Sequence, residues 1–199
     1  VGCLFDVPIR GELNGVHANN WSLDYCTVDP PTVGDETLYY DGYTATRCLL
    51  QGCSDGVKAN GNNTSLIECY IRTKAAGSSD HNDGIQNVGG NGPVNVIRCN
   101  INATPINGAG YGLIGNSALF FADGEVGLHT VHDNLLAGGG YVLAMYDGGT
   151  FNVQGNKFVR GSYLYNTHDM AGPGSGPQNV TWGTIRPNTF SDNGQVIAL

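Results

Sequence analysis

The stretch from Tyr43 to Ile71, YTATRCLLQGCSDGVKANGNNTSLIECYI, contains two copies of the pattern that decides the fold. Each copy has a cysteine with one apolar residue three positions before it and another two positions after it: Ala45 and Leu50 around Cys48, Leu66 and Ile71 around Cys69. Short runs rich in β-branched and aromatic residues, separated by glycine and asparagine, predict strands. A repeat of about 22 residues built in this way predicts a solenoid, because one unit cannot bury its apolar side alone.

The same pattern extends along most of the chain. The marker positions are Cys3, Cys26, Cys48, Cys69 and Cys99, with gaps of 23, 22, 21 and 30 residues, followed by Asn134, Asn156 and Asn188. Apolar residues stand three positions before seven of the markers, at Leu23, Ala45, Leu66, Val96, Val131, Val153 and Ile185. We therefore expect one column of stacked markers, with cysteines as compact apolar groups in the core. The asparagines should lie at a bend, where they can bond backbone groups and neighbouring amides.

Two solenoid folds compete at this repeat length. A leucine-rich repeat requires its leucine and asparagine consensus and usually a helical segment, whereas these repeats have no sustained helical period. The sequence therefore predicts an all-β, single-stranded, right-handed parallel β-helix of about eight rungs with a Cys/Asn ladder; the hand follows from strand twist and the preference for right-handed connections. Residues 1–199 form one domain. Cys3 already occupies a core position, so we expect the N-terminal cap or an upstream domain to be missing.

Composition limits the partners. The formal charge is −8, only 13% of the residues are charged and there are 31 glycines, so nucleic acid is not expected as a partner. No apolar run is long enough to span a bilayer, and a membrane partner is not expected either. Only Cys48 and Cys53 lie close together in sequence, which disfavours a metal role for the cysteines. A disulfide between these two is conceivable, although it would be geometrically restrictive.

A short motif occurs twice in neighbouring repeats. The segment Ser54-Asp55-Gly56-Val57-Lys58 is nearly duplicated by Asn82-Asp83-Gly84-Ile85-Gln86. If the two copies stack, Asp55 lies over Asp83 and Lys58 lies over Gln86 on the outer face, while the apolar residues point inward. Asp80 and His81 would reach this face from the adjoining loop. The sequence thus predicts a polar cluster on a rigid sheet.

The repeat pattern, together with the segment Ser79-Asp80-His81-Asn82-Asp83-Gly84-Ile85-Gln86, resembles the right-handed parallel β-helix proteins. These include polysaccharide lyases of the pectate lyase and chondroitinase B type and phage tailspikes. The segment is similar to a His-x-Asp-Gly-Ile-Gln sequence common in β-helix proteins of actinobacteria and their phages. The resemblance implies a protein that is extracellular or on a virion surface and that engages a polysaccharide along one long face. Some such proteins cleave the polymer, others bind it, and others are virion components.

Three interpretations of the cluster remain open, two catalytic and one structural. A lyase would use Lys58 as base, Arg72 or Lys74 to neutralise a uronate carboxylate and His81 as acid. A glycoside hydrolase would use two carboxylates, and Asp55 and Asp83 stacked at about 5 Å would suit a retaining geometry. Alternatively, Asp-Gly is a turn signal, and both aspartates bond turn backbone without any catalytic role.

Further residues are candidates for substrate binding. Gln86, Asp80, Arg72 and Lys74 lie in or near the cluster, and the tyrosines at 39, 40, 141, 146, 163 and 165 can provide aromatic platforms for sugar rings. The sequence carries no obvious acidic calcium-binding run, so no cofactor is expected, with Ca²⁺ kept as an alternative that the sequence does not indicate. We expect a glycan-engaging protein with lyase or glycosidase activity left open. The alternative is a non-catalytic virion component, in the tail or decorating the capsid, with other virion proteins or further copies of the chain as partners.

Overall fold

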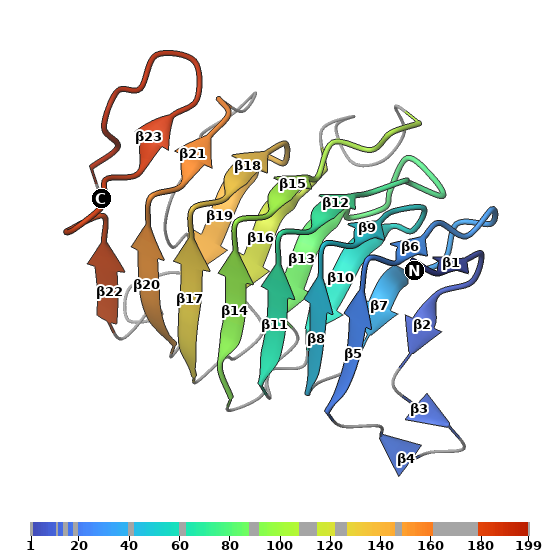
Figure 1. Cartoon of the computed structure of the whole chain (residues 1–199). Helices are drawn as coiled ribbons and strands as arrows, with labels where there is room; N and C mark the ends of the chain where they lie inside the picture. Colours follow the sequence, from blue (N-terminus) through green and yellow to red (C-terminus); the bar gives the residue numbers. More distant parts are fainter. Residues whose placement is uncertain are drawn as a thin grey trace.

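The computed structural model describes residues 2–10, 12–13, 16–17, 20–39, 42–59, 63–87, 92–107, 115–121, 127–145, 149–160 and 179–198. In these ranges all regular structure is β, and no helix is present. The strands form three stacked sheets of parallel strands, apart from one short antiparallel hairpin, β3 (Glu12–Leu13) with β4 (Val16–His17). The chain visits the three sheets in turn, and its two ends lie at opposite ends of the stack (Figure 1). This architecture is compatible with the predicted β-helix.

Sheet 1 has seven strands and forms the row of long arrows at the front of Figure 1. Its inward positions are mostly apolar, and Leu66, Val96 and Val131 are fully buried, as the repeat pattern predicts. Its outward face carries one row of uncharged polar residues in register, running from Ser22 through Thr44, Ser65, Asn95, Thr130 and Asn152 to Thr181. The strands are β5 (Trp21–Asp24), β8 (Tyr43–Thr46), β11 (Thr64–Ile67), β14 (Val94–Ile97), β17 (Leu128–His132), β20 (Thr150–Gln154) and β22 (Asn179–Trp182).

Sheet 2 has eight short strands and follows sheet 1 after a sharp bend. The apolar residue predicted two positions after each marker points inward here, and Leu50, Ile71, Ile101 and Leu136 are fully buried. The strands are β1 (Leu4–Phe5), β6 (Thr27–Val28), β9 (Leu49–Leu50), β12 (Tyr70–Arg72), β15 (Asn100–Asn102), β18 (Leu135–Ala137), β21 (Lys157–Phe158) and β23 (Thr189–Phe190).

Sheet 3 has six strands and lies behind sheet 1 in Figure 1. Leu38, Val57, Ile85, Leu119 and Leu143 form its fully buried inward row. The strands are β2 (Ile9–Arg10), β7 (Glu36–Tyr39), β10 (Asp55–Ala59), β13 (Asp83–Asn87), β16 (Ser117–Phe121) and β19 (Tyr141–Met145).

The bend between sheets 1 and 2 explains the marker residues. One residue with positive φ precedes several markers, for example Arg47 (φ 53°) before Cys48 and Asp133 (φ 59°) before Asn134. The Oδ1 of Asn134 accepts the Cys99 backbone N–H at 2.8 Å, and the Oδ1 of Asn156 accepts the Asn134 backbone N–H at 3.0 Å. The Nδ2 of Asn134 donates to the Val96 carbonyl at 2.9 Å. These bonds satisfy buried backbone groups where the sheet ladder is interrupted.

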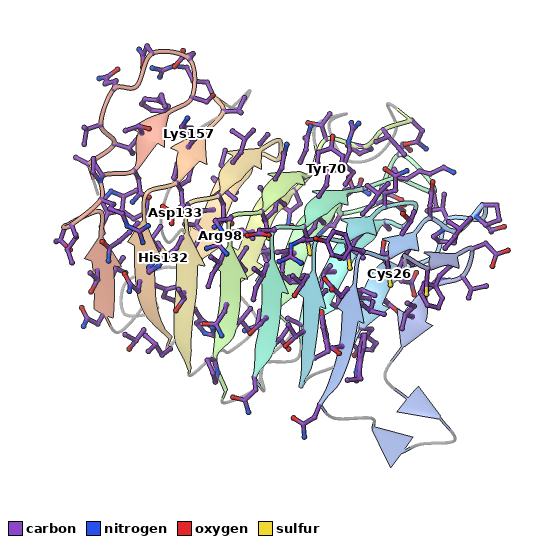
Figure 2. The ribbon with its side chains drawn as sticks, viewed as in Figure 1. Cys26, Tyr70, Arg98, His132, Asp133 and Lys157 are labelled. Carbon is purple, nitrogen blue, oxygen red and sulfur yellow. The ribbon has the colours of Figure 1, made fainter. Side chains whose placement is uncertain are left out.

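Three of the buried thiols donate hydrogen bonds to backbone carbonyls. The Cys48 thiol donates to the Thr46 carbonyl at 3.3 Å, the Cys69 thiol to the Ala45 carbonyl at 3.3 Å and the Cys99 thiol to the Leu66 carbonyl at 3.4 Å. Cys26, labelled in Figure 2, is also buried. All six cysteines are free, so Cys48 and Cys53 do not form a disulfide.

Two positions differ from the repeat pattern. Cys3 is exposed although the pattern places it in the core, because its strand β1 is the outermost strand of sheet 2 and has a neighbour on one side only. Ile185 was predicted to point inward but is 84% exposed. Trp182 instead pairs with Val153, and additional residues after Trp182 bulge outward before Asn188 returns to the marker column.

No helix among the described residues is long and apolar enough to cross a membrane.

Candidate functional site

The duplicated motif lies on two neighbouring strands of sheet 3, and its predicted stacking is confirmed. Lys58 on β10 pairs with Gln86 on β13, and Val57 pairs with Ile85. The two apolar residues are fully buried, whereas the Lys58 side chain remains 23% exposed. The motif thus presents its charged and amide side chains on the outer face of the sheet.

The glycines of the motif lie inside strands and not in turns, so the turn interpretation of Asp-Gly is wrong. A Cβ on Gly56 would lie 2.4 Å from Cγ2 of Ile71 and 2.5 Å from the Gly84 carbonyl oxygen. Gly84 has the same contacts one strand further, to Ile101 and Ala118. Glycine is therefore required because sheets 2 and 3 approach each other closely at this point.

The Asp55 carboxylate is buried and fully engaged. Its Oδ1 accepts the backbone N–H of Asp83 at 2.9 Å, on the neighbouring strand and not in a turn. Its Oδ2 lies 3.2 Å from the Lys58 ammonium. Burial raises the pKa of Asp55 to about 6, although the Asp83 N–H and Lys58 both act to lower it.

Lys58 lies between two carboxylates. Its Nζ is 3.2 Å from Asp55 Oδ2 and 3.7 Å from Oε2 of Glu36, the residue paired with Asp55 on the neighbouring strand. Burial lowers the pKa of Lys58, but Asp55 and Glu36 outweigh burial and raise it overall. A general base needs a neutral amine at working pH, whereas this environment keeps Lys58 protonated and suits a hydrogen-bond donor.

Asp83 has a different environment from Asp55. Its two carboxylate oxygens accept hydrogen bonds from Nδ2 of Asn116 at 3.1 and 3.3 Å. Asn116 was not predicted, because the long interval between Cys99 and Asn134 hides the repeat to which it belongs. A pair of carboxylates in unlike environments is the arrangement from which acid and base roles can arise.

Asp80 holds the loop that precedes β13. Its Oδ2 accepts the backbone N–H groups of Ala76 at 2.5 Å and Gly77 at 3.2 Å, and the Ser54 hydroxyl donates to it at 3.2 Å. The loop is thereby joined to the residue just before Asp55. His81 follows in the same loop and is exposed.

The remaining predicted residues divide between different surfaces. Arg72 ends β12 and pairs with Asn102 in sheet 2, and the Lys74 backbone N–H donates to the Cys53 carbonyl at 2.7 Å, in the connection between sheets 2 and 3. Tyr39 ends β7 and lies on sheet 3. Tyr141 begins β19 on the same sheet. Tyr40, Tyr146, Tyr163 and Tyr165 lie outside the described residues.

One outward row of sheet 3 brings the candidates together. Leu38 pairs with Val57, so the next residues on these two strands, Tyr39 and Lys58, occupy adjacent positions in the row. Lys58 pairs with Gln86, and Gln86 pairs with Phe120. All four side chains are partly exposed. Phe120 was not predicted, although Ser117–Phe121 has the same inward and outward alternation as Asp83–Asn87 and would have indicated it.

Within the described ranges, no group of three or more His, Cys, Asp or Glu side chains is arranged to hold a metal ion.

Comparison with family models, with curated proteins and with solved structures finds no match for this chain.

Proposed function

We propose that the chain binds a glycan along the outer face of sheet 3, over the row Tyr39, Lys58, Gln86 and Phe120. The observation that carries the proposal is the in-register placement of two partly exposed aromatic side chains at the ends of this row. Three strand spacings separate them, which corresponds to about 14 Å and to roughly the length of a trisaccharide. Aromatic faces pack against the C–H faces of sugars, and Lys58 and Gln86 can bond hydroxyl groups between them.

The proposal includes the finer description of the fold. We propose a single-stranded, right-handed parallel β-helix of about eight rungs with a continuous Cys/Asn ladder. The side-chain bonds from Asn188 to Asn156, from Asn156 to Asn134 and from Asn134 to the Cys99 backbone support the ladder. An extracellular or virion-surface location follows from the resemblance to β-helix proteins and is proposed on that basis.

Binding is better supported than cleavage. Both oxygens of Asp55 are engaged, by the Asp83 N–H and by Lys58. Lys58 is paired with two carboxylates, which opposes its use as a lyase base. The candidate groups for cleavage are Lys58, His81, Asp55 and Asp83, and an assay for cleavage products decides whether any of them is catalytic.

The test is retention on a panel of immobilised polysaccharides, with wild-type protein compared with Tyr39→Ala and Phe120→Ala. We expect each substitution to weaken retention severalfold, because each removes an aromatic face against which the C–H groups of a sugar can pack. Tyr70→Ala is the matched control, since Tyr70 is an exposed tyrosine on β12 of sheet 2 (Figure 2). It should retain full binding.

Other outcomes of the same experiment contradict the proposal. Loss of retention in Thr44→Val and Thr130→Val, with no change in the aromatic variants, would assign the glycan to the outer row of sheet 1. New unsaturated or reducing ends in the polymer would establish a lyase or a hydrolase. Retention on no polysaccharide by folded protein would favour the alternative, a virion structural component.

A further inference from the structure

We infer that the neighbouring thiols of Cys69 and Cys99 form a two-coordinate site for a soft monovalent cation such as Cu(I) or Ag(I). The sequence disfavours a tetrahedral metal site, which needs four converging ligands, whereas a two-coordinate site needs only one pair of thiolates. Soft cations of this kind select sulfur ligands. The site lies inside the bend between sheets 1 and 2, so its test does not depend on glycan binding.

The backbone places the two cysteines on adjacent strands. Tyr70 pairs with Asn100, and the residues immediately before them are Cys69 and Cys99. The Asn100 backbone N–H donates to the Cys69 carbonyl at 2.9 Å, and the Cys69 backbone N–H donates to the Cys99 Sγ at 3.4 Å. Both residues are buried, with 2% of their surface exposed. The Cys99 sulfur therefore lies directly beside the neighbouring cysteine, in a position shielded from water.

The strand spacing suits a linear sulfur–metal–sulfur unit. A metal–sulfur bond is about 2.3 Å long in zinc sites, so two such bonds in line span about 4.6 Å, close to the strand spacing of about 4.8 Å. A disulfide instead brings the two Cβ atoms to about 3.8 Å, which is less than this spacing. Both cysteines are free. The pair is thus better spaced for a bridging ion than for a direct bond.

The two thiols also influence each other's ionisation. The hydrogen bond with the Cys69 thiol lowers the pKa of Cys99; burial raises it, and the Cys69 backbone N–H lowers it, so that the pKa is lowered overall. A hydrogen bond with Cys48 lowers the pKa of Cys69, but the hydrogen bond with Cys99 and burial raise it to about 12. Cys99 therefore supplies the first thiolate. A cation bound to it provides the positive charge that allows Cys69 to ionise as well.

The neighbours on either side restrict the site to this pair. Beyond Cys99 lies Asn134, whose Oδ1 accepts the Cys99 backbone N–H at 2.8 Å and which has no soft ligand atom. Beyond Cys69 lies Cys48, whose thiol donates to the Thr46 carbonyl at 3.3 Å. The hydrogen bond with the Cys69 thiol and burial raise the pKa of Cys48 far above its usual range. Cys48 thus remains a protonated thiol beside the site.

Binding exchanges two protons for one cation. The S–H bonds of Cys69 and Cys99 break, two sulfur–metal bonds form, and both protons pass to the buffer. Neither the sulfur atoms nor the metal changes oxidation state, so no oxidant or reductant takes part. Because the site is buried, the cation enters when the bend opens transiently.

The experiment uses Ag(I) as the probe and Cys3→Ser protein, which lacks the exposed thiol. Excess glutathione is present, because it removes Ag(I) from single thiols. We expect the folded protein to retain Ag(I), with two protons released per ion and two sulfur neighbours in X-ray absorption at the silver edge. These readouts need no substitution in the core and are independent of any folding defect. A single sulfur neighbour, or loss of all Ag(I) to glutathione, overturns the inference.

Variants in the same background identify the two sulfur atoms. Cys69→Ala and Cys99→Ala should each lower the retention of Ag(I) at least tenfold, because a single thiolate remains. Cys53→Ala is the matched control, since Cys53 is a buried cysteine in the connection between β9 and β10, and it should retain the ion fully. Circular dichroism checks the fold of each variant. Unchanged retention in folded Cys69→Ala or Cys99→Ala would place the ion elsewhere and contradict the inference.

Discussion

His129 is the residue whose chemistry departs most from its surroundings. It is fully buried on β17, with its ring centroid 5.1 Å from that of Phe121 and 4.9 Å from that of Phe151. Neither ring nitrogen has a hydrogen-bond partner among the described residues. It pairs with Phe151 on β20, which is also fully buried. Burial lowers the pKa of His129 to about 4, because a charged imidazole would be desolvated.

This shift predicts acid sensitivity. The folded pKa is below the ordinary value near 6.5, so the contribution of His129 to stability is present above about pH 6.5 and is lost as the pH falls towards 4. The loss should reach about 3 kcal/mol. His129→Leu, which places an apolar side chain that cannot ionise at this position, should remove most of this loss. Urea unfolding at pH 4, 5 and 7 measures the effect, with exposed His81→Ala as control; an unchanged pH slope in His129→Leu would contradict the account.

The raised pKa of Asp55 predicts that stability changes with pH in the opposite direction. Its pKa is raised to about 6 by burial, so its stabilising contribution is present below about pH 4 and is lost as the pH rises through 6. Asp55→Asn keeps an acceptor for the Asp83 N–H and cannot ionise. Relative to wild type, the variant should become more stable by about 2 kcal/mol between pH 4 and pH 7. Parallel urea midpoints for the two proteins over this range would show that Asp55 is not the titrating group.

At the scale of the element, the bend between sheets 1 and 2 determines the repeat. Asn156 donates to the Val131 carbonyl at 2.8 Å and bonds Asn134 on one side and Asn188 on the other. Asn156→Leu should cost about 3 kcal/mol or more, because several buried backbone and amide groups lose their partners.

A second substitution tests the equivalence of the two marker types. The proposed ladder places cysteine in the same column in the first half of the chain, and the Cys69 backbone N–H donates to the Cys99 Sγ at 3.4 Å. Asn134→Cys should therefore be tolerated better than Asn134→Leu, with a smaller loss in the free energy of unfolding. Equal losses in urea denaturation would contradict the idea that a thiol can take the place of the asparagine at this position.

The elements also separate what the sequence could predict from what it could not. The inward positions of Leu66, Val96 and Ile71 follow from regular spacing, because each strand alternates and each bend has constant length. The inward position suggested for Ile185 is wrong, because extra residues after Trp182 change the phase of the last repeat. Asn116 was missed because the long interval between Cys99 and Asn134 hides its repeat, whereas the alternation of Ser117–Phe121 would have indicated Phe120. Arg72 belongs to sheet 2, and sequence proximity to the motif gave no information on which sheet it would join.

At the scale of the whole molecule, the three sheets present different outer faces. Sheet 1 carries a row of Ser, Thr and Asn residues, and the bend beside it carries paired charges such as Arg98 with Glu68 at 3.0 Å. Sheet 3 carries aromatic, ammonium and amide groups above buried carboxylates. A ligand that follows the outer row of sheet 3 must cross several strands, so its length in sugar units should decide its affinity.

The most direct test is the dissociation constant for a series of oligosaccharides of increasing length, taken from the polymer that the panel identifies. The account predicts that affinity rises steeply up to about three sugar units, the span of three strand spacings between Tyr39 and Phe120, and then levels off. Tyr39→Ala should abolish the gain with length and leave binding of the shortest sugars unchanged. An affinity that is independent of length, or a length dependence that persists in Tyr39→Ala, would contradict a continuous binding row on sheet 3.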